Sequence, residues 1–264
     1  MTYIILSFIF LFGLIIGSFL NCLVWRLHEK EGMWNRSYCP LCRKQIAWYD
    51  NIPILSFVLL GGKCRHCRKR ISIQYPIVEF LTGVLFVLSF YFNYQLSITN
   101  YEFPFTFNFL TLTLRDWFVI AVMIVVFIYD LRWNLILDKV TLPACLAVFI
   151  LNLVLGTGWL SLIVAGAIGG SFFLFQFLIS RGKWIGGGDI RLGLLMGFSL
   201  GSTGHLILAI LAAYFIGSII GLALIISNKK KWSSEIPLGV FLASATIFTI
   251  FWGDKAINWY LGLF

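Results

Sequence analysis

Long apolar runs constrain this chain more strongly than any other feature of its sequence. Eight of these runs alternate with polar stretches, and a helix that crosses a bilayer needs about 20 residues. The sequence therefore predicts an all-α polytopic membrane protein with about eight transmembrane helices. The predicted spans are residues 3–25, 75–94, 112–129, 140–155, 160–179, 192–200, 206–226 and 237–252.

Composition agrees with a protein that is solvated mainly by lipid. The chain is 60% hydrophobic and 12% charged, whereas about 25% of residues are charged in soluble domains. The run at 192–200 is too short to cross alone, so it either includes neighbouring residues or forms a short helix partly buried in protein. The run at 3–25 is expected to stay as an uncleaved helix, because no basic residue precedes it and no A-x-A-like site follows it.

The net charge of +9 raises the question of nucleic-acid binding, but the distribution of the charges indicates topology instead. Eighteen of the 20 Lys and Arg residues lie in alternate loops, ten of them within residues 26–70 and three at 229–231. The opposite side holds only Arg115 and Lys255. Because basic loops stay in the cytoplasm, we expect both termini outside the cell and no nucleic-acid partner.

The first cytoplasmic loop contains two C-x-x-C motifs, formed by Cys39 with Cys42 and Cys64 with Cys67. Their spacing resembles that of a zinc ribbon. Four thiolates would complete a tetrahedral site and leave no position for water, so a structural Zn²⁺ is favoured over a catalytic metal or no metal. His66 lies between two of the cysteines and is expected at the surface.

These features predict three parts of the chain: a helix at residues 1–25, a zinc-binding loop with four cysteine ligands at 26–73, and a membrane core of about seven helices at 74–264. Residues 97–115 carry aromatic side chains and almost no charge, and we expect them to form an outer loop. Asn21 lies within an apolar run, where an interhelical hydrogen bond is the favoured explanation.

Gly186, Gly187, Gly188 and Asp189 connect two apolar runs. An acid between membrane segments is costly and suggests function, although a polar turn that contains Asp is the simpler alternative. The glycines allow positive φ and the close approach of an extended peptide. Parity of the spans places this junction, with Arg191, on the cytoplasmic side.

Two further acids are predicted on the same side. Asp130 ends the third apolar run and Asp138 follows eight residues later. Asp138 is well placed to cap the next helix. Asp130 lies at a helix C-terminus, where a negative charge is unfavourable, and is therefore the better catalytic candidate. Glu79, about a turn into the second run, either contacts the substrate or braces a basic residue.

In combination, these residues resemble the type IV prepilin peptidases, which are membrane aspartyl proteases of the G-x-G-D kind. The resemblance implies cleavage of the leader from prepilin or pseudopilin precursors in a bacterial cell membrane, with Asp130 and Asp189 as the catalytic pair. It also implies N-methylation of the new terminus from S-adenosylmethionine. The motifs include Gly17-Ser18-Phe19-Leu20-Asn21, the paired C-x-x-C loop, Trp48-Tyr49-Asp50-Asn51-Ile52-Pro53, Tyr75-Pro76-Ile77-Val78-Glu79, Gly186 to Asp189 and Ile236-Pro237-Leu238-Gly239.

Peptide hydrolysis by two carboxylates explains why both aspartates would be needed. Close carboxylates share one proton, so one can take a proton from water while the other polarises the carbonyl. The alternative is an ion- or proton-coupled transporter, but its acids would lie near mid-bilayer. A methyltransferase alone would not need the aspartate pair. A zinc protease would need an open metal position and typically an H-E-x-x-H motif.

Overall fold

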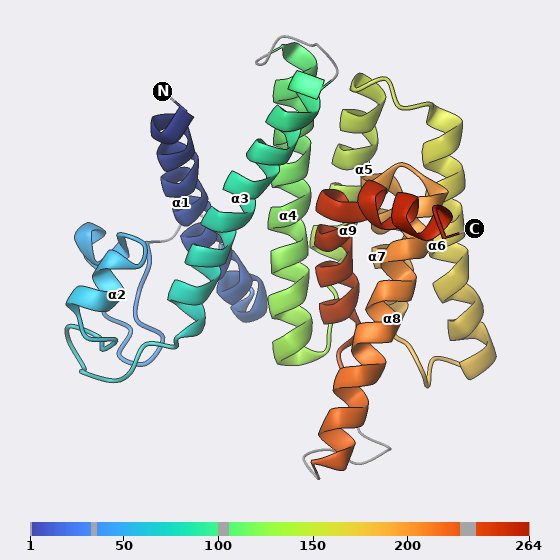
Figure 1. Cartoon of the computed structure of the whole chain (residues 1–264). Helices are drawn as coiled ribbons and strands as arrows, with labels where there is room; N and C mark the ends of the chain where they lie inside the picture. The colour runs from blue at the N-terminus through green and yellow to red at the C-terminus, as the bar shows by residue number, and fades with distance from the viewer. Residues whose placement is uncertain (1, 33–35, 100–105, 228–235, 264) are drawn as a thin grey trace. The chain divides into compact units, whose positions relative to one another are not determined.

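A computed structural model describes residues 2–32, 36–99, 106–227 and 236–263, and Figure 1 shows its helices. The chain forms two compact units, Met1–Phe92 and Asn93–Phe264. Helix α3 (Gln74–Thr99) begins in the first unit and ends in the second. The lysines at 229–231, predicted as a topology anchor, lie outside the described residues.

The first unit contains α1 (Thr2–Glu29), most of α3, and a loop that includes η1 (Trp48–Asn51) and α2 (Leu55–Leu59). Small residues bring α1 and α3 into backbone contact, since a Cβ atom on Gly13 would lie 2.7 Å from the Cα atom of Gly83. Asn21 Nδ2 donates to the carbonyl oxygen of Tyr75 at 3.2 Å. This contact confirms the predicted interhelical hydrogen bond.

The second unit is a bundle of helices that surrounds a short central one. It is built from the end of α3, α4 (Phe107–Trp133), α5 (Asp138–Val154), α6 (Trp159–Ser180), α7 (Gly187–Leu200), α8 (Thr203–Ile226) and α9 (Leu238–Leu261).

Helix α7 packs against α5, α6, α8 and α9 (Figure 1). Its side chains Leu192, Leu195 and Met196 are almost completely buried. A Cβ atom on Gly193 would lie 2.5 Å from the carbonyl oxygen of Gly169, so α6 and α7 touch through their backbones. Close packing on several sides restricts the movement of α7.

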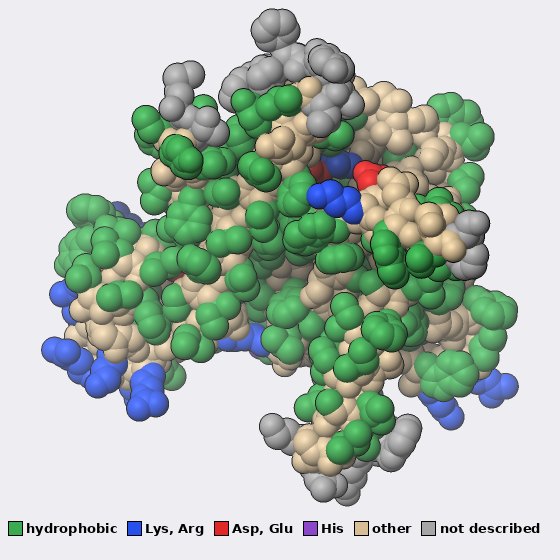
Figure 2. Space-filling view, in the orientation of Figure 1, with side chains coloured by type: hydrophobic (Ala, Val, Ile, Leu, Met, Phe, Trp, Pro, Cys, Tyr) green, Lys and Arg blue, Asp and Glu red, His purple; other side chains and the backbone are tan. Residues whose placement is uncertain are grey.

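Within the part of the chain that the structure describes, six helices are long and apolar enough to cross a membrane: α1, α3, α4, α6, α8 and α9. The other two predicted spans correspond to α5 and α7, which have 17 and 14 residues. Figure 2 shows hydrophobic side chains over much of the visible surface of the helices. Among the described residues there are two isolated β-bridges and no strand. The predicted all-α, multi-pass membrane architecture is confirmed.

The prediction of an outer loop at residues 97–115 was wrong. Helix α4 begins at Phe107, after Thr106, whose hydroxyl accepts the N–H of Phe109 at 3.3 Å. This N-cap starts the helix earlier than hydropathy indicates. Arg115 is consequently a helical residue, and Lys255 likewise lies within α9.

Candidate active site

Asp130 is buried in the last turns of α4, with 5% of its surface exposed. Its Oδ2 atom accepts the backbone N–H of Val240, in the first turn of α9, at 3.1 Å. A Cβ atom on Gly239 would lie 2.8 Å from the same oxygen, so only glycine leaves room for the carboxylate there. The positive end of α9 therefore offsets the unfavourable position of Asp130 near the end of its own helix.

Asp189 lies in the first turn of α7 and is 8% exposed. Its Oδ2 atom accepts the N–H of Gly186 at 2.9 Å, which satisfies a donor that precedes the helix. The positive φ that the glycines allow is not adopted in this stretch. Gly186 has φ −82°, while Gly187 and Gly188 already belong to α7, so helix initiation fixes the backbone at negative φ.

Ile136 connects the surroundings of the two aspartates. A Cβ atom on Gly188 would lie 2.7 Å from the Cβ atom of Ile136, and one on Gly239 would lie 3.1 Å from its Cδ1 atom. The charge of Asp130 also acts on Asp189. The structure thus brings the two predicted residues together in one unit. Gly188 packs against Ile136 instead of lying open to a peptide, whereas a Cβ atom on Gly187 would meet open space.

Asp138 and Arg191 form an ion pair that joins α5 to α7. Both side chains are partly exposed, at 47% and 41%. The prediction that Asp138 caps α5 was wrong: the N-cap position is occupied by Leu137, and Asp138 is the first helical residue. Its carboxylate is drawn toward the nearby guanidinium, although it still lies at the favourable end of the helix dipole.

A polar contact between two apolar helices of this unit was missed by the sequence analysis. The Tyr214 hydroxyl donates to Gln176 Oε1 at 2.9 Å and thereby links α8 to α6. The charge of Asp189 also acts on Tyr214. The sequence does show a Gln in one apolar span and a Tyr in another. Uncharged polar residues in such spans indicate a functional site less strongly than an acid does. The sequence analysis also did not predict the close approach of Gly239 to Asp130.

The four loop cysteines form a cluster suited to a metal ion. Their Sγ atoms all lie within 4.8 Å of one another, and a zinc tetrahedron with Zn–S bonds of about 2.3 Å needs S–S distances of about 3.8 Å. The two motifs have the same backbone turn. The N–H groups of Arg43 and Arg68 donate to the carbonyls of Cys39 and Cys64, and both arginines have φ 57°.

Charged contacts organise the rest of this loop, where Figure 2 shows Lys and Arg side chains around α2. Arg65 binds both carboxylate oxygens of Asp50, at 2.7 and 2.8 Å. The guanidinium holds the pKa of Asp50 below its ordinary value. The backbone N–H groups of Cys67 and His66 lower the pKa of the Cys64 thiol to about 7. The Lys44 N–H lowers the pKa of Cys42, but burial and the neighbouring cysteine side chains outweigh it and raise that pKa to about 11. His66 is exposed, as predicted.

Glu79 is buried in the first unit, with 6% exposed, and its Oε2 atom accepts the N–H of Ile54 at 2.8 Å. Neither predicted role describes this contact, because the partner is a backbone amide. Ile54 has φ 59°, which is rare for a β-branched residue. Glu79 therefore holds a strained position of the loop against α3.

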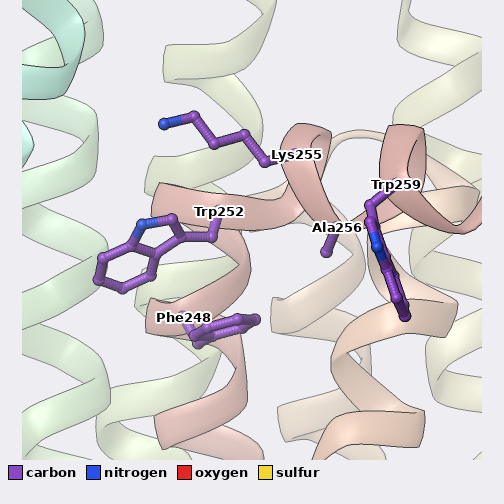
Figure 3. Close-up of a pocket in the computed structure, with 5 residues that line it drawn as sticks. All are labelled: Phe248, Trp252, Lys255, Ala256 and Trp259. Carbon is purple, nitrogen blue, oxygen red and sulfur yellow. The ribbon is translucent and has the colours of Figure 1, made fainter.

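A separate pocket of 360 Å³ lies along α9 and is lined by Phe248, Trp252, Lys255, Ala256 and Trp259 (Figure 3). Every lining residue belongs to α9, between Phe248 and Trp259. Asp130 lies instead against the first turn of α9. The pocket is consequently distinct from the aspartate site.

Comparison with known proteins gives matches over most of the chain. The Bacterial Peptidase A24 N-terminal domain matches residues 11–93, and the Type IV leader peptidase family matches residues 117–226. A "Prepilin leader peptidase/N-methyltransferase" of Aeromonas salmonicida (strain A449) is 32% identical, with 97% of this chain and 93% of the relative covered.

Two further relatives carry the same name. The protein of Legionella pneumophila is 31% identical, with 96% of this chain and 93% of the relative covered. The protein of Bacillus subtilis (strain 168) is 30% identical, with 97% and 98% covered.

The chain belongs to the type IV leader peptidase family. The resemblance inferred from the motifs is thereby confirmed, and a transporter is not supported. No solved structure matches the chain. The Type IV leader peptidase match includes both Asp130 and Asp189, while the N-terminal match includes the four clustered cysteines.

Proposed function

We propose that this protein is a membrane aspartic endopeptidase that removes the leader peptide from type IV prepilin-like precursors, with Asp130 and Asp189 as the catalytic pair. One observation carries the assignment of these residues. Two buried acids from different helices lie at one site, each held by a backbone N–H group at or just before the start of a helix. Family membership supports the choice of reaction.

The chemistry needs one ionised and one protonated carboxyl group. The ionised carboxylate removes a proton from a water molecule, whose oxygen attacks the scissile carbonyl carbon. The protonated carboxyl donates a hydrogen bond to the carbonyl oxygen and stabilises the charge that develops there. Breakdown of the tetrahedral intermediate breaks the C–N bond, and the leaving nitrogen receives the proton that the first carboxylate removed from water. Water is thus divided between a new carboxylate and a new amine.

The substrate would approach this site from the bilayer. We propose that the apolar segment of a prepilin lies in lipid while its basic leader stays in the cytoplasm, where the basic loops of this chain are predicted to lie. This arrangement places the scissile bond near the membrane face at which Asp130 and Asp189 are predicted. Both termini would then be outside the cell.

The cysteine cluster is proposed to bind a structural Zn²⁺ through Cys39, Cys42, Cys64 and Cys67. The ion would hold together a loop that is too small to have a core of its own. We also propose that the protein methylates the new N-terminal amine from S-adenosylmethionine. This second activity is supported by the relatives, which are named as N-methyltransferases as well as leader peptidases.

Co-expression with a type IV prepilin tests both activities. We expect a product shortened at the leader junction, and a further mass increase of one methyl group if the amine is modified. The mass of the intact product and of its N-terminal peptide separates the two results. An unprocessed prepilin beside membrane-inserted, zinc-loaded protein would contradict the protease assignment.

A further inference from the structure

A second buried polar cluster lies in the second unit, at the C-terminal end of α7. Arg115 of α4 donates through NH1 to the carbonyl oxygen of Ser199 at 3.2 Å and to Asn152 Oδ1 at 3.1 Å. Asn152 of α5 donates to the carbonyl oxygen of Phe198 at 2.8 Å. Two carbonyls in the last turn of α7 therefore receive side-chain hydrogen bonds from two neighbouring helices.

The charge of Arg115 is compensated inside the same cluster. Asp116 Oδ1 lies 2.6 Å from Arg115 NH2, and Asp116 Oδ2 accepts from Asn93 Nδ2 at 2.9 Å. Asp116 and Asn152 are each 2% exposed. Removing charged and polar groups from water is costly, and in membrane proteins it suggests a specific purpose. Hydrophobic packing alone would not require this cluster.

The length of α7 gives that purpose. Its 14 residues correspond to about 21 Å, less than the roughly 30 Å of a hydrocarbon core. A helix this short does not cross the core alone, and the carbonyls of its last turn, where Ser199 is 1% exposed, need partners from neighbouring helices. Arg115 and Asn152 supply those partners at one defined depth. The other end of the same helix carries Asp189 in its first turn.

We propose that Arg115 and Asn152 are positioning residues that fix α7 along its axis and so set the position of Asp189 relative to Asp130. They act about the length of the helix away from the carboxylates and touch no substrate. This inference rests on the proposed function, because it takes Asp189 as a catalytic group. It adds two residues that the leader-peptidase chemistry does not require by itself.

The structure provides both a matched control and an internal reporter. Asn108 lines the same 270 Å³ pocket as Arg115 and Asn152, but it is exposed, and no contact to the α7 carbonyls is seen for it among the described residues. Cys145 of α5 is 5% exposed, with its Sγ atom 4.0 Å from the carbonyl oxygen of Arg191 in α7. Movement of α7 should expose this thiol.

The test compares Asn152→Leu and the double variant Arg115→Gln/Asp116→Asn, which leaves no lone buried charge, with Asn108→Leu. Cleavage of a purified prepilin gives kcat and KM, and maleimide labelling of Cys145 is located by peptide mass spectrometry. For Asn152→Leu and for the double variant we expect kcat to fall about 100-fold, which is the effect of a small misplacement of a catalytic group. KM should stay within about twofold, and Cys145 should react faster. Asn108→Leu should match the wild type.

Several results would overturn the proposal: an unchanged kcat, a lower kcat with Cys145 still protected, or a change confined to KM. If these variants do not reach the membrane, Asn152→Ser and Arg115→Lys replace them, and we expect smaller effects on kcat and on Cys145 labelling in the same direction. Failure of the wild type to cleave any prepilin would count against the proposed function. In that case Cys145 labelling would still test whether Arg115 and Asn152 fix the position of α7.

Discussion

Asp130 in α4 accepts a 3.1 Å hydrogen bond from the backbone N–H of Val240, in the first turn of α9. The contact joins an acid near the end of one membrane helix to the positive end of another. It stabilises a carboxylate in a site where an isolated charge would be costly. The catalytic role proposed for Asp130 therefore rests on a carboxylate that the first turn of α9 holds in place.

The first prediction concerns the two aspartates. Asp130→Asn and Asp189→Asn should each reduce prepilin cleavage by at least about 100-fold, because an amide can neither remove a proton from water nor share one. Both variants should still insert in the membrane and retain zinc. Asp254→Asn is the control, since Asp254 lies in α9 with its side chain 87% exposed. Near-normal processing by either active-site variant would remove that residue from the proposed pair.

The second prediction concerns the ion pair between Asp138 and Arg191. Partly exposed pairs contribute about 0.2–1 kcal/mol, so Asp138→Asn should reduce cleavage by about fivefold or less. The exchanged variant Asp138→Arg/Arg191→Asp should recover part of the loss seen in each single variant, measured as kcat/KM on one prepilin. If Asp138→Asn were as inactive as Asp130→Asn, Asp138 would instead be the first catalytic acid.

Much of this site could be predicted from local sequence. Hydropathy indicated the helices, and the alternation of basic loops predicted Asp130 and Asp189 on the same side of the membrane. Contacts between distant segments could not be predicted in this way. The approach of Gly239 to Asp130 and the contact of Gly188 with Ile136 depend on how three helices pack. Arg115 was assigned to the outer loop because it is a charged residue near the edge of an apolar run, whereas α4 begins at Phe107 and includes it.

The third prediction concerns metal binding. Purified protein should contain about one zinc per chain, and replacing any of Cys39, Cys42, Cys64 or Cys67 with Ser should lower this content, since each supplies a thiolate. Cys22→Ser, in α1, is the matched control and should keep its zinc. Elemental analysis of unchelated protein makes the measurement. Absence of zinc and of any other bound metal would contradict the site.

Removing the metal should show whether the bound zinc supports the structure of the loop or takes part in catalysis. A chelator should increase protease sensitivity within the loop, because the ion closes a fold that lacks its own core. Cleavage of prepilin should decline only as the loop opens, and added zinc should restore it. Full activity in metal-free protein with an open loop would show that the loop does not contribute to catalysis under those conditions.

The last prediction concerns glycines beside the aspartates. Gly239→Ala would place a Cβ atom 2.8 Å from Asp130 Oδ2, and Gly188→Val would place one 2.7 Å from the Cβ atom of Ile136. Both substitutions should displace a catalytic group or its support and reduce kcat by about 100-fold. Gly187→Ala is the matched control, because a Cβ atom there meets open space.

Gly182 would be a poor control for this experiment, since its φ of +74° makes a substitution strained whatever space surrounds it. The variants are compared by kcat and KM on one prepilin, with zinc content as the measure of folding. Loss of kcat at Gly188 and Gly239, with Gly187→Ala unaffected, would show that close packing holds the two acids in place. Equal loss at all three glycines would indicate that substrate access along the α7 N-terminus, and not packing, sets the requirement for glycine.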